Sequence, residues 1–164
     1  MNIYVASSWR NEYQPSVVTA LRQQGHEVYD FRNPAPGDHG FHWSEIDPEW
    51  KHWTPEAFRR ALAHEIAQRG YARDREAMRR CDMAVLVLPA GRSAHLEAGW
   101  LLGSGRPVVI FSPTPVEPEL MYLLAGAAPR EWFACTYSDM LICVNKAGEK
   151  LAKRGVGIPK GAPQ

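Results

Sequence analysis

The chain has 164 residues, of which 45% are hydrophobic and 23% are charged, and its formal net charge is +1. These values are ordinary for one soluble globular domain, and so small a net charge excludes recruitment of a nucleic acid polymer or a membrane by a global electrostatic field. No run of about 18 apolar residues is present, and no cleavable signal precedes the first strand pattern, so we expect a cytoplasmic protein.

Strand and helix patterns alternate along the chain. A strand at 3–6 is followed by a helix at 15–24, a strand at 26–31 and an irregular insertion at 33–55. Next come helices at 54–66 and 71–80, a strand at 83–88, a helix at 94–102, a strand at 108–111, a short helix at 118–124, a strand at 132–136 and a helix at 137–153. The continuous apolar run at 83–88 is typical of a strand covered on both faces.

This alternation predicts an α/β protein with a parallel sheet and right-handed crossovers. Five strands suit a single-domain, flavodoxin-like (Rossmann-like) three-layer sandwich, with the domain at 1–154 and a loose tail at 155–164. In such sheets ligands bind beyond the carboxyl ends of the strands, near the point where the strand order reverses. That rule selects two loops, at residues 7–10 and 90–93.

Glu97 is the first candidate for chemistry, because we expect it in the first turn or so of a helix that starts at this edge. The positive end of the helix dipole keeps a carboxylate there ionised. An ionised carboxylate can attack an anomeric carbon and form a glycosyl-enzyme intermediate. The alternative is that Glu97 only complements the helix dipole.

Two further side chains could assist such a reaction. Tyr4, in the first strand, could hold the Glu97 carboxylate through its hydroxyl, and Asp74 could give or relay a proton to a leaving base. The alternatives are that Tyr4 is an ordinary core residue and that Asp74, between Arg73 and Arg75, is a solvated surface charge.

The two selected loops carry groups that bind anions. Arg10 and Arg92, with Ser7, Ser8 and Ser93, would form an anion site if the loops meet, because guanidinium and hydroxyl groups and helix N–H groups all suit phosphate. The alternative is ordinary turn chemistry. No Walker loop or GxGxxG pattern is present, so neither a nucleoside triphosphate nor a dinucleotide is indicated.

The irregular insertion is rich in tryptophan, with Trp43, Trp50 and Trp53 within eleven positions. Trp43 could stack on a nucleobase. Equally, these rings could cover the sheet or an interface between subunits.

No metal site is expected. His39 and His42 lie in one loop with no evident third ligand, whereas zinc sites use three or four protein ligands. Cys81, Cys135 and Cys143 are an odd number without CxxC spacing, and they predict buried thiols in a reducing compartment rather than a zinc site or a disulfide framework.

The chain resembles the nucleoside 2-deoxyribosyltransferase family and its relatives, the nucleoside 5′-monophosphate N-glycosidases, over residues 2–124. Four segments in the same order carry the resemblance. They are a first strand with a tyrosine (2–6), a segment with the aspartate that handles the base (73–85), a nucleophile motif of Glu, a small residue and Gly (95–99), and a segment that a neighbouring subunit lends to the active site (118–122).

The resemblance implies a flavodoxin-like fold, an enzyme without a metal or organic cofactor, and a homo-oligomer with shared active sites. It implies a small-molecule nucleoside or nucleotide substrate and a covalent deoxyribosyl–Glu97 intermediate. Attack by a second base then gives transfer, and attack by water gives hydrolysis. The lent segment would bring Glu119 and Met121 to the substrate, although Glu119 stands where transferases typically have an amide.

Two departures from the transferases favour a nucleotide over a nucleoside. Transferases carry an acidic residue six positions before the nucleophile, whereas this chain has Gly91, followed by Arg92 and Ser93. The first loop, Ser7-Ser8-Trp9-Arg10, is similar to the Ser-x-Arg pattern of the monophosphate glycosidases. An acidic group would repel a 5′-phosphate, whereas Arg and Ser would bind it. The Gly91 departure also leaves open a non-catalytic nucleotide-binding or sensor module on the same fold.

Overall fold

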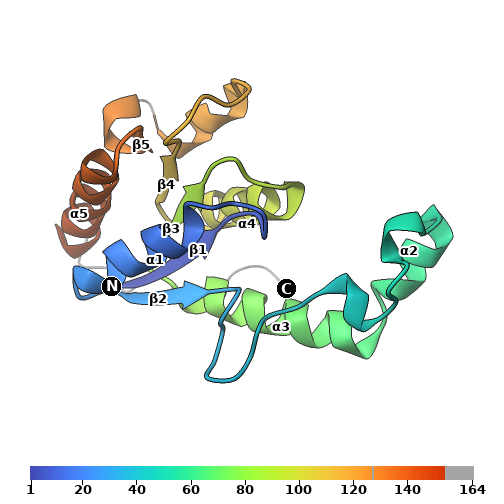
Figure 1. Ribbon diagram of the computed structural model, residues 1–164. Helices are drawn as coiled ribbons and strands as arrows, with labels where there is room; N and C mark the ends of the chain where they lie inside the picture. The colour runs from blue at the N-terminus through green and yellow to red at the C-terminus, as the bar shows by residue number, and fades with distance from the viewer. Residues whose placement is uncertain (127, 154–164) are drawn as a thin grey trace. The chain divides into compact units, whose positions relative to one another are not determined.

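A five-stranded sheet organises the computed structural model, which describes residues 1–126 and 128–153 (Figure 1). Its strands are β1 (Asn2–Ala6), β2 (Glu27–Asp30), β3 (Met83–Val87), β4 (Val108–Phe111) and β5 (Phe133–Ala134). The spatial order β2-β1-β3-β4-β5 is the doubly wound order of flavodoxin-like proteins. The predicted α/β fold with a five-stranded parallel sheet is confirmed.

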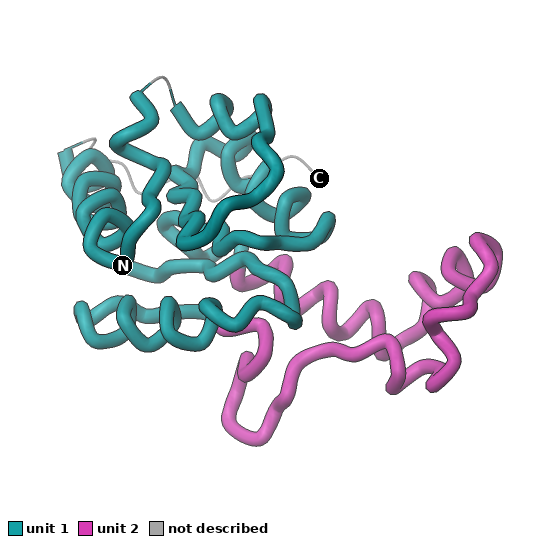
Figure 2. The backbone as a smooth tube through the Cα atoms, turned by 45° about the horizontal axis from the view of Figure 1, so that its top comes forward, with its two compact units in different colours: residues 1–29, 78–164 teal, residues 30–77 magenta. Residues whose placement is uncertain are grey.

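The chain divides into two compact units (Figure 2). Unit 1 comprises Met1–Tyr29 together with the chain from Met78 onward, and unit 2 comprises Asp30–Ala77. The predicted irregular insertion therefore falls in unit 2. The domain boundary at 1–154 stays a prediction, and the tail predicted at 155–164 lies outside the described residues.

One face of the sheet packs against α1 (Gln14–Gln23) and α5 (Tyr137–Lys153). Strand side chains alternate between the two faces, so every second residue of a strand enters this core. The parallel register matches the layers across strands, with Val85 opposite both Val5 and Val109. The buried residues of this core are Ile3, Val5, Val17, Val18, Leu21, Val28, Met83, Val85, Val87, Val109, Phe111, Ala134, Met140, Cys143, Val144 and Ala147.

The other face is covered by α4 (Arg92–Gly103), which contacts β1, β3 and β4. The buried residues of α4 are Ala94, Ala98 and Leu101, whose spacing places them on one side of the helix. Small side chains at the first two positions let the helix lie close to the strands. The residues of β1 and β3 that face this layer are those absent from the first core, including Tyr4 and its register partner Ala84.

The remaining elements are short, apart from one long helix. Unit 2 holds η1 (Trp43–Glu45), η2 (Trp50–His52), α2 (Pro55–Ala61) and most of α3 (Glu65–Arg80), while η3 (Leu120–Ala125) and η4 (Pro129–Glu131) belong to unit 1. Three expectations are corrected: the helix expected to continue to residue 66 ends at Ala61 as α2, α3 begins at Glu65 rather than at residue 71, and the helix expected at 118–124 is the 3₁₀ helix η3. None of the helices in the described ranges is long and apolar enough to cross a bilayer.

The three cysteines differ in their surroundings, which corrects one expectation. Cys81 and Cys143 are buried, whereas Cys135 is exposed. Burial raises the pKa of the Cys81 thiol to about 12, and this effect outweighs the nearby positive charge of Arg106. Cys81 is therefore an unreactive core thiol at neutral pH.

Arg106 is a buried charge that joins the carboxyl-terminal ends of α3 and α4. Its guanidinium donates hydrogen bonds to the carbonyl oxygens of Cys81 (2.9 Å) and Arg79 (2.8 Å) and to the hydroxyl oxygen of Ser104 (3.0 Å). These acceptors lie at the carboxyl-terminal ends of α3 and α4, where the helix dipole is negative. The dipoles and carbonyls together stabilise a charge that is only 6% exposed.

Replacing Arg106 with Ala should lower the free energy of unfolding by about 3 kcal/mol, because the substitution leaves buried acceptors without donors. Arg106→Lys should recover only part of this loss, since an ammonium group cannot donate in the three directions of the guanidinium. Urea unfolding measures both values. Arg130→Ala, at an exposed position, is the control, and an Arg106→Ala midpoint equal to that of this control would contradict the structural role.

Candidate functional site

The loops that follow β1 and β3 are joined at the carboxyl edge of the sheet. Ser7 Oγ donates a hydrogen bond to the carbonyl oxygen of Val87, the last residue of β3, at 2.9 Å. Asn11 Nδ2 donates to the same carbonyl at 3.1 Å and to that of Pro89 at 2.9 Å. These bonds tie the chain around the first loop to the end of β3, and a contact of residues 7–10 with residues 90–93 stays a prediction.

Asn11 also fixes the start of α1. Its Oδ1 accepts hydrogen bonds from the backbone N–H groups of Tyr13 (2.8 Å) and Gln14 (3.1 Å). The amide therefore holds one helix start with its oxygen and the β3 loop with its nitrogen. Because Asn11 is only 2% exposed, these bonds are shielded from water and hold both loops in one arrangement.

The expected anion-binding residues divide into two groups. The hydroxyls of Ser7 and Ser8 are engaged within the protein: Ser7 Oγ donates to the Val87 carbonyl oxygen, and Ser8 Oγ accepts from the backbone N–H of Arg10 at 3.2 Å. The side chains of Trp9 and Arg10 are exposed, as are Gly91, Arg92 and Ser93 at the start of α4. The guanidinium groups of Arg10 and Arg92 and the hydroxyl of Ser93 are therefore accessible to a ligand.

Glu97 lies deeper in its helix than the sequence suggested. Helix α4 begins at Arg92, with Gly91 as its N-cap, and no acidic residue occupies the first turn. The first backbone bond of the helix runs from His95 N to Gly91 O, so the N–H groups without helical acceptors precede Glu97. The expected first-turn position is wrong, and the helix dipole acts on this carboxylate more weakly than it would on one in the first turn.

Glu97 nevertheless lies on the sheet side of α4. It is three residues after the buried Ala94 and four before the buried Leu101, which places it on the same helical stripe. Its side chain is half-buried. Because Cα–Cβ bonds in a helix tilt toward the N-terminus, the side chain leans toward the carboxyl edge of the sheet.

Tyr4 lies on the same side of the sheet as α4 and is completely buried. Its ring stacks on Tyr29 of β2 with centroids 5.4 Å apart and planes 14° apart, and its register partner in β3 is the small Ala84. These neighbours hold the ring in one orientation under the α4 layer. A hydrogen bond from its hydroxyl to Glu97 stays a prediction.

Asp74 belongs to unit 2 and lies on the inward stripe of α3. Ala67, Gly70 and Met78 on this helix are buried, and Asp74 is spaced from them by seven, four and four residues and is half-buried. This placement differs from a fully solvated surface charge. Participation of Asp74 in a common site with Glu97 stays a prediction.

Trp43 is the centre of an aromatic cluster within unit 2. The rings of Phe41, Trp53 and Phe58 surround it edge-on, at centroid distances of 4.7, 5.6 and 5.6 Å respectively. Such edge-to-face pairs stabilise a small core. Packing within unit 2 is a use of these rings that the sequence did not predict, and stacking of Trp43 on a base stays a prediction.

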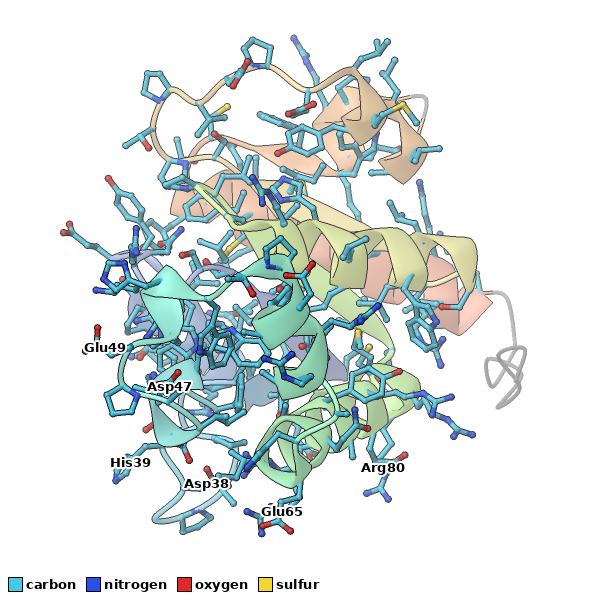
Figure 3. All side chains as sticks on the ribbon, turned by 90° about the vertical axis from the view of Figure 1, so that its right-hand side faces the viewer. Asp38, His39, Asp47, Glu49, Glu65 and Arg80 are labelled. Carbon is cyan, nitrogen blue, oxygen red and sulfur yellow. The ribbon has the colours of Figure 1, made fainter. Side chains whose placement is uncertain are left out.

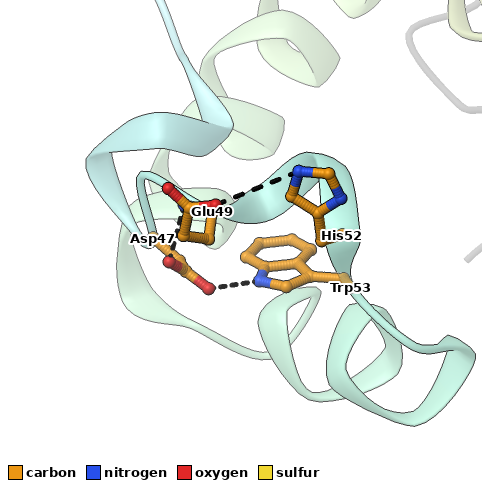
Figure 4. A network of polar contacts seen from close by, with 4 residues as sticks. All are labelled: Asp47, Glu49, His52 and Trp53. Atoms are coloured by element: carbon orange, nitrogen blue, oxygen red, sulfur yellow. Dashed lines mark hydrogen bonds and ion pairs between the residues drawn. The ribbon is translucent and has the colours of Figure 1, made fainter.

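A polar network fixes one ring of this cluster (Figure 4). The Nε1–H of Trp53 donates to Asp47 Oδ2 at 2.5 Å, and the backbone N–H of Glu49 donates to Asp47 Oδ1 at 2.9 Å. The bond from Trp53, followed by that from Glu49, lowers the pKa of Asp47. The carboxylate therefore serves as an internal anchor of unit 2.

The histidine-bearing loop of unit 2 surrounds a shallow hollow of about 680 Å³. Asp38 and His39 lie on this loop (Figure 3). Asp38 forms an ion pair with Arg73 and accepts from the backbone N–H of Gly40 at 2.9 Å. Across the two described ranges, no group of three or more His, Cys, Asp or Glu side chains is arranged to hold a metal ion.

At the other side of the unit 1 edge, η3 is held to α4 by a histidine–tyrosine pair. His95 Nδ1 lies 2.8 Å from the carbonyl oxygen of Gly91, and His95 Nε2 lies 2.9 Å from the hydroxyl of Tyr122. The two rings stack with planes 8° apart. The expected substrate residues Glu119 and Met121 precede Tyr122 by three residues and by one, and both are exposed.

Sequence reasoning therefore missed three residues that organise this edge: Asn11, His95 and Tyr122. Asn11 had a local signal, because asparagine before a helix commonly caps it. No local signal marks the pairing of His95 with Tyr122, since the two are 27 positions apart.

Comparison with protein-family models and with curated protein sequences gives no match. Among solved structures, the chain is similar to the 2-deoxyribosyltransferase of the psychrotolerant bacterium Bacillus psychrosaccharolyticus. The identity is 25%, the match covers 73% of this chain and 77% of that chain, and the TM-score is 0.44. A TM-score of this size gives no structural argument, so the fold assignment rests on the strand order and register of this chain.

Exchanging Asn11 for Asp should separate its two roles, because the carboxylate keeps the acceptor for α1 but loses the donor to Val87 and Pro89. We expect backbone amides at 88–93 to exchange hydrogen at least about fivefold faster, as loss of one net hydrogen bond implies. Hydrogen exchange with mass spectrometry measures this. Asn145→Asp, at an exposed position of α5, is the matched control, and unchanged exchange at 88–93 in Asn11→Asp would refute the coupling of the loops.

Proposed function

We propose that this protein cleaves or transfers the N-glycosidic bond of a 2′-deoxynucleoside or nucleoside 5′-monophosphate, with Glu97 as the nucleophile. The observation that carries the proposal is the placement of Glu97 and Tyr4 in one layer of unit 1. A half-buried carboxylate and a buried tyrosine lie on the same side of the sheet, and the carboxylate leans toward the edge where the loops of β1 and β3 are tied together.

The proposed reaction has two steps. A Glu97 carboxylate oxygen attacks C1′ while the C1′–N bond breaks, and the electron pair of that bond goes to the base, which takes a proton. Asp74 is the proposed source or relay of this proton. Water or a second base then attacks C1′ and releases Glu97, which gives hydrolysis or transfer respectively.

The exposed groups at the mouth of the site support a substrate with a 5′-phosphate. Arg10 and Arg92 are exposed, no acidic side chain stands at Gly91, and Ser93, next to Arg92 in the sequence, offers an exposed hydroxyl. A guanidinium group can bind phosphate through two parallel hydrogen bonds. A free nucleoside would leave these cations without a partner.

A homo-oligomer is part of the proposal. Large apolar side chains gather on η3 and beside its contact with α4, and each is more than half exposed: Leu96, Leu120, Met121, Leu123 and Leu124. Exposed apolar patches of this kind commonly mark contact surfaces. The proposed roles of Glu119 and Met121 depend on such a contact.

The first test is Glu97→Gln, which keeps the shape of the side chain but removes its charge. Release of base from nucleotides and nucleosides should fall at least about a thousandfold, because the amide cannot act as the nucleophile. Chromatography of free and exchanged bases measures release, and the intact mass of the quenched wild-type enzyme should show a glycosyl adduct that the variant lacks.

Glu149→Gln, on the exposed surface of α5, is the matched control and should keep wild-type turnover. Wild-type turnover by Glu97→Gln would refute the mechanism. Tight nucleotide binding by the wild type with no base released from any substrate would instead indicate the non-catalytic binding module that the Gly91 departure left open.

The second test separates nucleotides from nucleosides. Arg10→Ala should lower kcat/KM for nucleoside 5′-monophosphates by about a hundredfold, because a charge-assisted bond to phosphate is lost, and should change it less than about threefold for nucleosides. Steady-state kinetics on both substrate classes measure the difference, with the exposed Arg130→Ala as control. Equal losses for both classes would remove the phosphate argument but leave the glycosidic chemistry standing.

A further inference from the structure

His95 occupies a central position at the carboxyl edge of unit 1, and both of its ring nitrogens are engaged. The Gly91 carbonyl oxygen, 2.8 Å from Nδ1, can only accept a hydrogen bond, so Nδ1 must carry a hydrogen. In the neutral imidazole Nε2 is then an acceptor, and the Tyr122 hydroxyl, 2.9 Å away, is its donor. The two contacts together select the Nδ1–H tautomer.

The surroundings of Tyr122 keep it a donor. Burial of the phenol raises the pKa of Tyr122, and the negative charge of Glu119 raises it further, so the hydroxyl keeps its proton well above neutral pH. The stacking of the two rings, with centroids 5.9 Å apart, holds the hydroxyl at its acceptor. Tyr122 therefore supplies the hydrogen bond that favours one tautomer of His95.

The contact with Gly91 matters because of where that residue lies. Gly91 is the N-cap of α4, and its carbonyl accepts from the backbone N–H of His95 at a long 3.3 Å. The shorter side-chain bond of 2.8 Å therefore strengthens a weak first turn. Gly91 carries no side chain of its own, so the imidazole takes over the role of fixing the loop that precedes Arg92 and Ser93.

We propose that His95 is a positioning residue. It fixes Gly91–Ser93, the N-cap and first two residues of α4, for the phosphate of a nucleotide, and Tyr122 sets the tautomer of His95. The nucleotide ligand in this assignment rests on the proposed function, whereas the hydrogen-bond geometry of His95 does not. His95 acts through Gly91 and does not touch the reacting atoms. If Nε2 carried the hydrogen instead, an Nδ1 lone pair would face the Gly91 carbonyl and repel it, and the loop would be released.

The first measurement reads the tautomer directly and needs no catalysis. Long-range ¹H–¹⁵N correlation spectra of the imidazole nitrogens distinguish Nδ1–H from Nε2–H, and loss of one signal set in His95→Asn assigns His95 among the six histidines of the chain. We expect the Nδ1–H form in the wild type and a shift toward Nε2–H in Tyr122→Phe, which keeps the ring but lacks the donor. An Nε2–H wild type would overturn the assignment.

The second measurement reads the loop through ligand affinity. Calorimetric titration with a 2′-deoxynucleoside 5′-monophosphate is done in the Glu97→Gln background, so that the ligand is not consumed. Tyr122→Phe and His95→Ala should each weaken binding by about fivefold, the effect of one hydrogen bond. His95→Asn should restore near-parental affinity, because an asparagine amide can donate to Gly91 from the place of Nδ1.

Tyr137→Phe is the matched control, since Tyr137 packs against Phe111 in the core on the opposite face of the sheet. Unfolding curves of all variants show whether a loss of affinity is a loss of fold. Three outcomes would each overturn the positioning role. They are parental affinity in Tyr122→Phe and His95→Ala, no rescue by His95→Asn, and no nucleotide binding by the parent.

The two proposals fail separately. A wild-type protein that binds nucleotide with the expected tautomer and variant pattern, but releases no base, would refute the glycosidic function and support the positioning role. If the wild-type enzyme releases base and its Tyr122→Phe variant binds and turns over normally, the glycosidic function is supported and the positioning role of His95 is refuted.

Discussion

The carbonyl oxygen of Val87 is the point on which the candidate site depends. It is the carbonyl of the last residue of β3, and it accepts hydrogen bonds from two side chains of the neighbouring loop, those of Ser7 and Asn11. A buried carbonyl without a donor is costly, so this acceptor draws the loop after β1 onto the loop after β3. Asn11 then passes the constraint on to the start of α1, which packs on the far face of the sheet.

The same edge shows how a helix start can be stabilised from outside its own sequence. Gly91 gives α4 an N-cap with no side-chain acceptor, and the first backbone bond of the helix is long. His95 closes this weak turn with its ring, and Tyr122 holds the ring from η3. The chain thereby combines an open, uncharged N-cap, which suits an anionic ligand, with a loop that is nevertheless held in place.

Unit 2 combines most of the long helix α3 with a cluster of edge-to-face aromatic contacts. Trp43 contacts three other rings edge-on, and Asp47 accepts a hydrogen bond from the indole N–H of Trp53. The backbone of Gly70 in α3 lies so close to Phe41 that an added Cβ would come within 2.9 Å of the Phe41 Cβ. This cluster explains why the insertion is rich in aromatic residues although its sequence has no period.

The sequence by itself determined the alternation of strands and helices, and hence the parallel sheet, because burial on one or both faces imposes a local period that single segments carry. It also determined that Glu97 lies on the helix that follows β3. Only the tertiary structure decided that α4 begins at Arg92, that Glu97 lies in the second turn, and that His95 meets Tyr122. These outcomes depend on hydrogen bonds to backbone carbonyls and on contacts between residues far apart in the chain. The local pattern of residue types predicts neither kind of interaction.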